Sequence, residues 1–274
     1  RAGLRMKLIY NPFSGKKRAV RYGIEKAFGD IIITTDADCI VCPGWVRKHA
    51  EWYISDGQEM VLAPVVQKPA GGFWSHFGVY EFSALQAITE ATATAGHPVM
   101  CNAANMSFRR DVYLRHTDEL RSDLPSGDDM FLLAAVMRDG GAVTHDGSGA
   151  AAAETAAAVT AAALLRQRAR WASKAFMLRS ASTLTLAAAT AACNAAVAAA
   201  AVAAVVWTKF IPVAAVMYAI KTVPDYLLIS TEMRQRGTKM NAGMFLLAEI
   251  IYPFYFVVVG VMSRLPGAGR FRGR

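Results

Sequence analysis

The first half of the chain alternates short apolar runs with amphipathic stretches, which is the pattern of an α/β domain. The apolar runs predict strands at about Met6–Tyr10, Ile31–Thr35 and Met60–Val66, and a further short strand between Val99 and Arg110. The stretches between them predict helices at Lys16–Phe28, Trp45–Ile54, Phe73–Thr92 and Met130–Met137. Because Ile31–Thr35 is a β-branched run without alternation, we expect it to be a buried parallel strand.

The pattern changes after Gly140, where alanine dominates as far as about Ala204. Alanine is the best helix former, so the alanine runs at 150–153 and 161–163 favour helices. Longer apolar segments follow at about Thr183–Val206, Ile211–Ile229 and Met244–Met262, and each approaches the ~20 residues that a bilayer helix needs. They predict membrane segments, with buried helices of a soluble domain as the alternative.

The second and third apolar segments contain polar residues that a simple membrane span lacks. Lys221 and Asp225 interrupt the second and Glu249 interrupts the third, so either segment can be tilted, broken or interfacial. Three full crossings would also place the basic tail Arg264–Arg274 outside, against the charge rule for membrane proteins. We therefore expect that the tail breaks this rule or that one segment does not cross.

Composition narrows the classes of partner. The chain has 274 residues, 54% of them hydrophobic, and a net charge of +9. Its excess basic residues lie beside apolar segments, which is typical of the cytoplasmic side of a membrane, and we expect no nucleic-acid partner. Cys39 and Cys42 form a C-x-x-C without a second pair at ligand spacing, so packing cysteines are favoured over a zinc or redox site.

Two acidic side chains follow directly after the predicted strand Ile31–Thr35. Asp36 and Asp38 are separated by one residue, and ligands of doubly wound sheets bind outside the carboxyl ends of the strands. Two such carboxylates can approach a divalent cation, because Mg²⁺ and Mn²⁺ take oxygen ligands from carboxylates and phosphates. Capping of a following helix is the simpler alternative for either residue.

A second acidic pair, Asp128 and Asp129, precedes the predicted helix Met130–Met137. Helix capping explains one of these two acids, but it does not explain both. Adjacent like charges raise each other's proton affinity, which suits a carboxylate that acts as a general base near neutral pH.

The third candidate group lies in the basic helix that precedes the apolar segments. Gln167, Arg170 and Trp171 fall at positions i, i+3 and i+4, so they share one helical face. An amide, a guanidinium and an indole together can hold a pyrophosphate and stack on a sugar ring. A juxtamembrane helix with an interfacial Trp and a snorkelling Arg would look the same.

The three groups in this order resemble a known series of motifs. Asp36-Ala37-Asp38, Asp128-Asp129 and Gln167-x-x-Arg170-Trp171 are similar to the D-x-D, E/D-D and Q-x-x-R-W motifs of membrane-bound family 2 glycosyltransferases, the group of cellulose, chitin and hyaluronan synthases. The resemblance extends from about Asn11 to Lys174. It implies a GT-A fold, which is Rossmann-like α/β, followed by a membrane region. Residues 1–180 would form the catalytic domain and 181–274 would supply two to three transmembrane or interfacial helices.

The resemblance also implies an inverting transfer of a sugar from a nucleotide diphosphate, a UDP-sugar, to a hydroxyl of a glycan or lipid-linked acceptor. Asp38 would bind Mg²⁺ or Mn²⁺ with Asp36, and Asp129 beside Asp128 would be the catalytic base. The donor and its diphosphate would contact Asp36, Asp38, Lys16, Gln167 and Arg170. The acceptor would contact Trp171 and, in the segment 101–110, Asn105.

The family's first βα unit is missing before Arg1, so the sequence is expected to be truncated. The expected setting is a bacterial-type inner membrane with its lipids around the apolar segments and the catalytic domain in the cytoplasm. A membrane-anchored scaffold that retains the fold without catalysis is the main alternative. A transporter or channel, suggested by the charged residues in apolar segments, fits the long, motif-rich soluble half less well.

Overall fold

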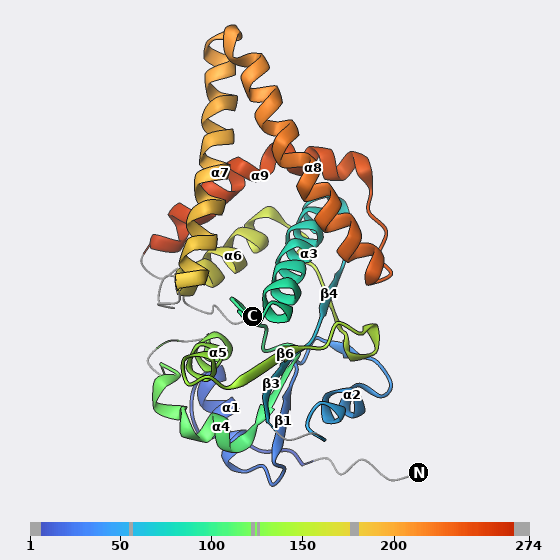
Figure 1. Cartoon of the computed structure of the whole chain (residues 1–274), viewed down its shortest axis with the longest axis vertical. Helices are drawn as coiled ribbons and strands as arrows, with labels where there is room; N and C mark the ends of the chain where they lie inside the picture. The colour runs from blue at the N-terminus through green and yellow to red at the C-terminus, as the bar shows by residue number, and fades with distance from the viewer. Residues whose placement is uncertain (1–6, 55–56, 122–123, 125–126, 176–180, 266–274) are drawn as a thin grey trace.

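The structure is a computed structural model that describes residues 7–54, 57–121, 124, 127–175 and 181–265. Figure 1 shows an α/β unit at one end of the molecule and a hairpin of two long helices that rises from the other end. Two helices lie between these parts, α3 (Gly72–Thr94) and α6 (Ala161–Ala175). The α/β unit carries the candidate site, and α3 and α6 connect it to the long helices.

The main sheet has the strand order β1 (Ile31–Thr34), β5 (Met106–Arg109), β3 (Gln58–Leu62) and β6 (Ala142–His145). β5 is antiparallel to both of its neighbours, whereas β3 and β6 are parallel. The prediction of a buried parallel strand at Ile31–Thr35 is therefore wrong in its pairing, because β5 separates β1 from the strands that run in its direction. The residues of β1 are only half-buried, yet the acidic pair still follows its carboxyl end.

A smaller sheet has the order β2 (Ile40–Val41), β7 (Ala153–Ala156) and β4 (Val65–Lys68). The predicted strand Met60–Val66 is thus two strands in two sheets, with Pro64 between them, since proline has no N–H for a continuous ladder. The Pro64 carbonyl accepts the Ala153 N–H at 3.0 Å instead. That contact belongs to the strand β7, where the alanine pattern predicted a helix, so tertiary pairing overrides helix propensity here.

Helices cover the main sheet and close its core. Their bounds are α1 (Lys16–Glu25), α2 (Trp45–Glu51), α4 (Arg110–Arg115) and α5 (Asp128–Arg138), with short 3₁₀ turns at Thr117–Glu119 and Gly149–Ala151. Met60, Phe108, Leu132 and Val136 are almost fully buried between sheet and helices. Residues 7–10 form no strand, because Leu8 and Tyr10 are exposed and have no sheet to pack on; Met6 lies outside the described residues.

The predicted helix at Phe73–Thr92 is confirmed, with one or two further residues at each end in α3. The helices predicted at Lys16–Phe28 and Trp45–Ile54 are shorter than expected, ending at Glu25 and Glu51.

Within the described residues, three helices are long and apolar enough to cross a membrane. They are α7 (Ala181–Val206), α8 (Ile211–Gln235), which follows a 3₁₀ turn at Thr208–Phe210, and α9 (Ala242–Arg264). In Figure 1, α7 and α8 run up and down as a hairpin, while α9 runs across it below the tip, beside α6 and α7. The predicted class, an α/β unit followed by long apolar helices, is confirmed. The predicted domain boundary at 180 lies outside the described residues.

Candidate active site

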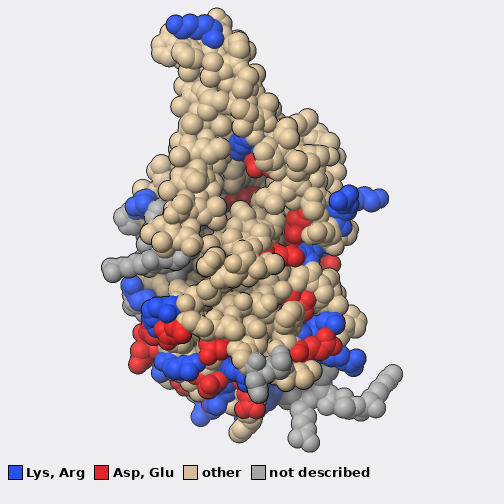
Figure 2. Space-filling view, viewed as in Figure 1, with Lys and Arg blue, Asp and Glu red and all other residues tan. Residues whose placement is uncertain are grey.

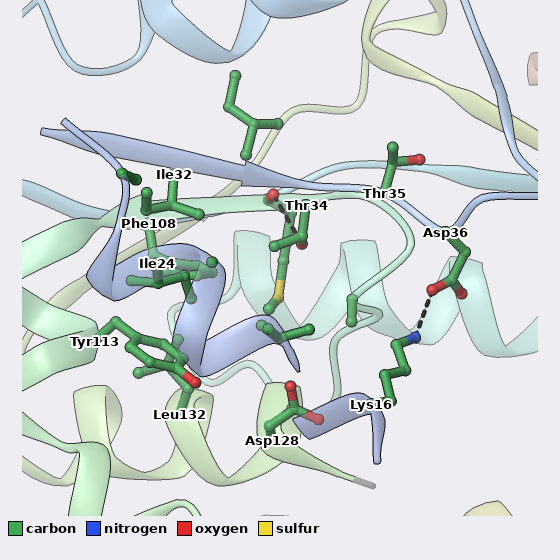
Figure 3. Close-up of a pocket in the computed structure, with 16 residues that line it drawn as sticks. Lys16, Ile24, Ile32, Thr34, Thr35, Asp36, Phe108, Tyr113, Asp128 and Leu132 are labelled. Atoms are coloured by element: carbon green, nitrogen blue, oxygen red, sulfur yellow. Dashed lines mark hydrogen bonds and ion pairs between the residues drawn. The ribbon is translucent and has the colours of Figure 1, made fainter. Parts of the chain in front are cut away.

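The first acidic pair lies where β1 leaves the main sheet. Asp36 is half-buried and Asp38 is exposed. Lys16, the first residue of α1, donates a hydrogen bond of 2.5 Å from Nζ to Oδ1 of Asp36 (Figure 3). This ion pair raises the pKa of Lys16, although burial acts in the opposite direction. The predicted donor contacts Lys16 and Asp36 are thus neighbours in space, although they are 20 residues apart in sequence.

A cavity of about 380 Å³ begins at these residues and extends beneath the sheet. Figure 3 shows its two ends: Thr35, Asp36, Lys16 and Asp128 gather at one, and apolar residues fill the other. The apolar end includes Ile24, Ile32, Phe108 and Leu132, with Tyr113 beside them. Charged groups at an apolar cavity are weakly screened, so their effects on each other are larger than in water.

The second acidic pair begins α5 beside this cavity. Gly127 precedes the helix with a φ of +96°, a conformation that favours glycine. Asp129 accepts hydrogen bonds from the backbone N–H of Ala103 at 3.1 Å and of Met130 at 2.8 Å. Burial raises the pKa of Asp129, and the neighbouring charge of Asp128 adds to this effect. A raised pKa suits a carboxylate that acts as a general base.

The helix α6 brings two cations to the acids. Burial lowers the pKa of the Arg170 guanidinium, and the carboxylates of Asp129 and Asp36 lie near enough to oppose this effect. Lys174, one turn further along α6, is only 8% exposed. Burial lowers its pKa to about 8, with a further decrease from Arg170 and an opposing effect of Asp129. The predicted diphosphate contact Arg170 is therefore close to both acidic groups.

The other two residues of the predicted motif have different surroundings. Gln167 accepts a hydrogen bond of 2.7 Å from Arg168 through Oε1. Trp171 packs against Phe82 of α3, and the Arg168 guanidinium lies 4.3 Å from the centre of its indole ring. Gln167 and Trp171 thus share contacts with Arg168, whereas Arg170 approaches the acids.

The prediction that Asn105 contacts the acceptor does not fit the structure. Asn105 is 1% exposed, and its amide donates to the carbonyl oxygens of Pro64 and Ala151 at 2.6 and 2.7 Å. Its Oδ1 faces Trp45 Nε1 at 2.9 Å and His49 Nε2 at 3.0 Å. Its hydrogen-bonding groups therefore hold the two sheets and α2 together and are not available to a sugar.

Sequence reasoning did not identify Lys174, which lies seven residues after Gln167 and four after Arg170. That spacing on one helix was the available signal. Its side chain passes close to Gly127, because a Cβ on that glycine would be 2.9 Å from Lys174 Cδ. Among the described residues, no three His, Cys, Asp or Glu side chains gather as a metal cluster, and Cys39 and Cys42 are free thiols.

Residues 2–116 match the family "Glycosyl transferase family 2". The matched segment includes Lys16, Asp36 and Asp38, and it ends before the acidic pair of α5 and before α6. No curated protein matches the chain. The match supports glycosyl transfer in general, with a nucleotide-sugar donor and an acceptor. Together with the mixed sheets and the long apolar helices, it agrees with the fold class expected from the sequence.

Proposed function

We propose that this chain is an inverting, metal-dependent glycosyltransferase of the cellulose, chitin and hyaluronan synthase-like group. It would transfer a sugar from a nucleoside-diphosphate sugar, a UDP-sugar, to a hydroxyl of a glycan or lipid-linked acceptor. The observation that carries this proposal is the approach of Arg170 to both Asp36 and Asp129, which are 93 positions apart and come from different elements. Such a group of acids and cations beside a cavity suits a diphosphate and a base-assisted displacement.

The acidic residue for the displacement is Asp129. As the acceptor hydroxyl attacks the anomeric carbon, Asp129 would take its proton and the nucleoside diphosphate would leave with the electrons of the broken bond. Its two backbone hydrogen bonds hold the carboxylate in place at the start of α5. A single displacement needs no enzyme nucleophile.

Two cations near the acids would stabilise the charge that the leaving group gains. Arg170 and Lys16 would contact the diphosphate, and Gln167 and Trp171 would contact donor and acceptor from the same helix. Interactions that strengthen as charge develops lower the barrier, whereas equal binding of substrate and transition state does not.

The two acids after β1 fit a metal that is shared with the substrate. Mg²⁺ and Mn²⁺ are commonly bound by one or two carboxylates together with phosphate oxygens and water. Asp38 is exposed and Asp36 is half-buried at the cavity, so both can reach a bound diphosphate. When bound, the ion would neutralise charge on the leaving diphosphate.

The long helices suggest how the chain is attached to a bilayer. A helix of 26 residues such as α7 is about 39 Å long, more than the ~30 Å of a hydrocarbon core. The tip of the hairpin of α7 and α8 would enter the membrane, and α9, which runs across the hairpin below its tip, would lie along the surface (Figure 1). This arrangement returns the chain to the catalytic side, which we place in the cytoplasm of a bacterial-type inner membrane.

The proposal is tested by release of nucleoside diphosphate from a panel of UDP-, GDP- and ADP-sugars, using the full-length protein in nanodiscs. We expect turnover of one donor with Mn²⁺ or Mg²⁺ and loss of turnover in EDTA. Absence of turnover with every donor and acceptor tried would contradict it.

A non-catalytic scaffold is the second candidate, because Asp36 is already paired with Lys16 and Asn105 has only internal partners. Binding of Mn²⁺ followed by electron paramagnetic resonance separates the two. A scaffold should bind no Mn²⁺ in the presence of nucleoside diphosphate, whereas the enzyme should bind one ion that is lost in Asp38→Ala.

A further inference from the structure

The buried side chain of Arg168 connects α6 with α3 and also contacts two of its neighbours on α6. It is 3% exposed, and its Nε donates to Oε2 of Glu81 on α3 at 2.9 Å. Its Nη1 donates to Gln167 at 2.7 Å, and its guanidinium stacks on the ring of Trp171 at 4.3 Å. One buried side chain therefore touches two of the residues that are proposed to bind substrate.

The same ion pair extends to the membrane helix α9. Tyr255 on α9 contacts both carboxylate oxygens of Glu81 through its hydroxyl, at 3.2 and 3.1 Å. Tyr255 is 6% exposed and packs against Phe77 of α3 with a ring separation of 4.8 Å. Other positions of α9 expose apolar side chains, among them Leu247, Ile250, Phe254 and Val258. The helix thus has one face on this ion pair and one face suited to lipid.

Stability alone does not account for a buried ion pair at this position. Replacement of buried ion pairs by apolar residues of similar volume is often neutral or stabilising, because both charges must lose their water. What arginine adds is a rigid plane with five donors, which can stack on an indole and donate to an amide and a carboxylate simultaneously. Such a group fixes the orientation of its partners.

We propose that Arg168 is a positioning residue that, through Glu81 and Tyr255, couples the seating of the membrane helix α9 to the orientation of Gln167 and Trp171. This inference rests on the proposed roles of Gln167 and Trp171 in substrate binding. We call the set Glu81, Arg168 and Tyr255 the α9 bridge. Lipid that holds α9 in place thereby holds the substrate-binding side of α6 in place.

The test uses the full chain in nanodiscs with the variants Arg168→Lys, Tyr255→Phe and Glu81→Met/Arg168→Met. The double variant removes both charges together and so avoids an unpaired buried charge that would unfold the protein. We expect it to keep its melting temperature and to lose about 10- to 100-fold in kcat/KM, since small misplacements of binding groups have effects of this size. Arg168→Lys should recover only part of this loss, because lysine cannot stack and bridge at once.

Tyr218→Phe is the matched control. Its hydroxyl donates from α8 to the Ile250 carbonyl of α9 at 3.1 Å, so the variant removes a similar contact of the same helix without touching the α9 bridge. Tyr218→Phe should leave kcat/KM unchanged, whereas Tyr255→Phe should lower it and should raise the KM for the acceptor.

A second readout does not depend on activity. The chain has five tryptophans, and labelling with 5-fluorotryptophan gives a ¹⁹F resonance for each, with Trp171 assigned through Trp171→Phe. The Trp171 resonance should shift in Tyr255→Phe and in the double variant, and not in Tyr218→Phe. An unchanged resonance and unchanged kcat/KM in the folded double variant would overturn the inference. If the Trp171 resonance shifts in these variants but the native chain shows no turnover, the α9 bridge is supported and the proposed function is contradicted.

Discussion

The two halves of the molecule arrange charge and apolar surface in opposite ways. In the α/β half, side chains such as Phe108 and Leu132 are buried, and most charged side chains are exposed or line the cavity. In the helical half, large apolar residues of α7, α8 and α9 are exposed, and Lys221 is buried within 2.6 Å of both Asp225 and Glu249. Figure 2 shows the same contrast, with charges gathered over the α/β end and a largely uncharged surface on the hairpin except at its tip.

This difference indicates two uses of charge. Near the hairpin, the charged groups of α8 and α9 are satisfied by one another, as expected for ionisable residues in apolar surroundings. At the cavity, Lys16 of α1 pairs with Asp36, and Arg170 of α6 lies near Asp36 and Asp129, beside a space that can hold a ligand. Charges in the first half are therefore expected to carry chemistry, and those in the second half to carry structure.

The largest effect should come from Asp129→Asn, which keeps the shape of the side chain and removes the base. We expect turnover to fall about 10²- to 10⁴-fold, the usual contribution of a general base. Binding of nucleoside diphosphate, measured by calorimetry, should stay nearly intact. If binding and not turnover is lost, Asp129 is not the base.

The converse change in the helical half is Lys221→Met, which leaves two acids without their cation. Breaking a buried pair by removing one partner costs about 3–5 kcal/mol. We expect a clear drop of the melting temperature in detergent. Lys209→Met at the exposed tip of the hairpin is the control and should melt as the native chain does. Equal melting temperatures of the two variants would contradict the structural role of the charged residues in the helical half.

Asp38→Ala should abolish the metal dependence of nucleotide affinity without unfolding, because Asp38 is exposed. The Kd for nucleoside diphosphate should become the same with Mn²⁺ and with EDTA, as followed by calorimetry. The control is Asp118→Ala, which removes an acid that does not line the cavity. This variant should retain the effect of the metal on nucleotide affinity. A persistent metal effect in Asp38→Ala would place the ion elsewhere.

The pKa of Lys174 is about 8, so its charge is lost as the pH rises above that value. If this charge supports the bound diphosphate, kcat/KM for the donor should decline above a pH of about 8. Lys174→Arg keeps the charge and should remove the decline. A pH profile that is identical in the two proteins would exclude Lys174 from donor binding.

The smallest effect is expected from Asp128→Asn on the acidic limb of the same profile. The charge of Asp128 adds to burial in raising the pKa of Asp129, so its removal lowers that pKa. Because the base works when deprotonated, the acidic limb should move to lower pH. A shift to higher pH would contradict the electrostatic coupling of the two acids.

Several features could be derived from the sequence because their causes are local. The apolar segments after Ser180, the helix at 73–92 and the positions of the acids after β1 and at the start of α5 depend on periodicity and neighbouring residues. The pairing of the strands could not be derived in this way. The insertion of β5 beside β1 and the strand at Ala153–Ala156 depend on partners far along the chain.

The same limit applies to the candidate site. Asp36, Asp129 and Arg170 were selected by residue type and order, and the structure brings them near one another. Asn105 looked equally suitable as a polar residue in the right segment, but burial and its hydrogen bonds to Pro64 and Ala151 make it internal. Residue type indicates which chemistry a side chain can perform, and its surroundings decide whether the side chain is accessible.

The sequence by itself determined the order of the motifs, the division into an α/β half and an apolar half, and the chemistry of the candidate residues. Only the tertiary structure decided that α9 crosses the α7–α8 hairpin, that Lys174 joins the acids, and that Arg168 connects α6 with Glu81 and Tyr255. The physical reason is that hydrophobic periodicity specifies which face of a helix is buried, whereas the identity of the partner depends on how distant elements pack.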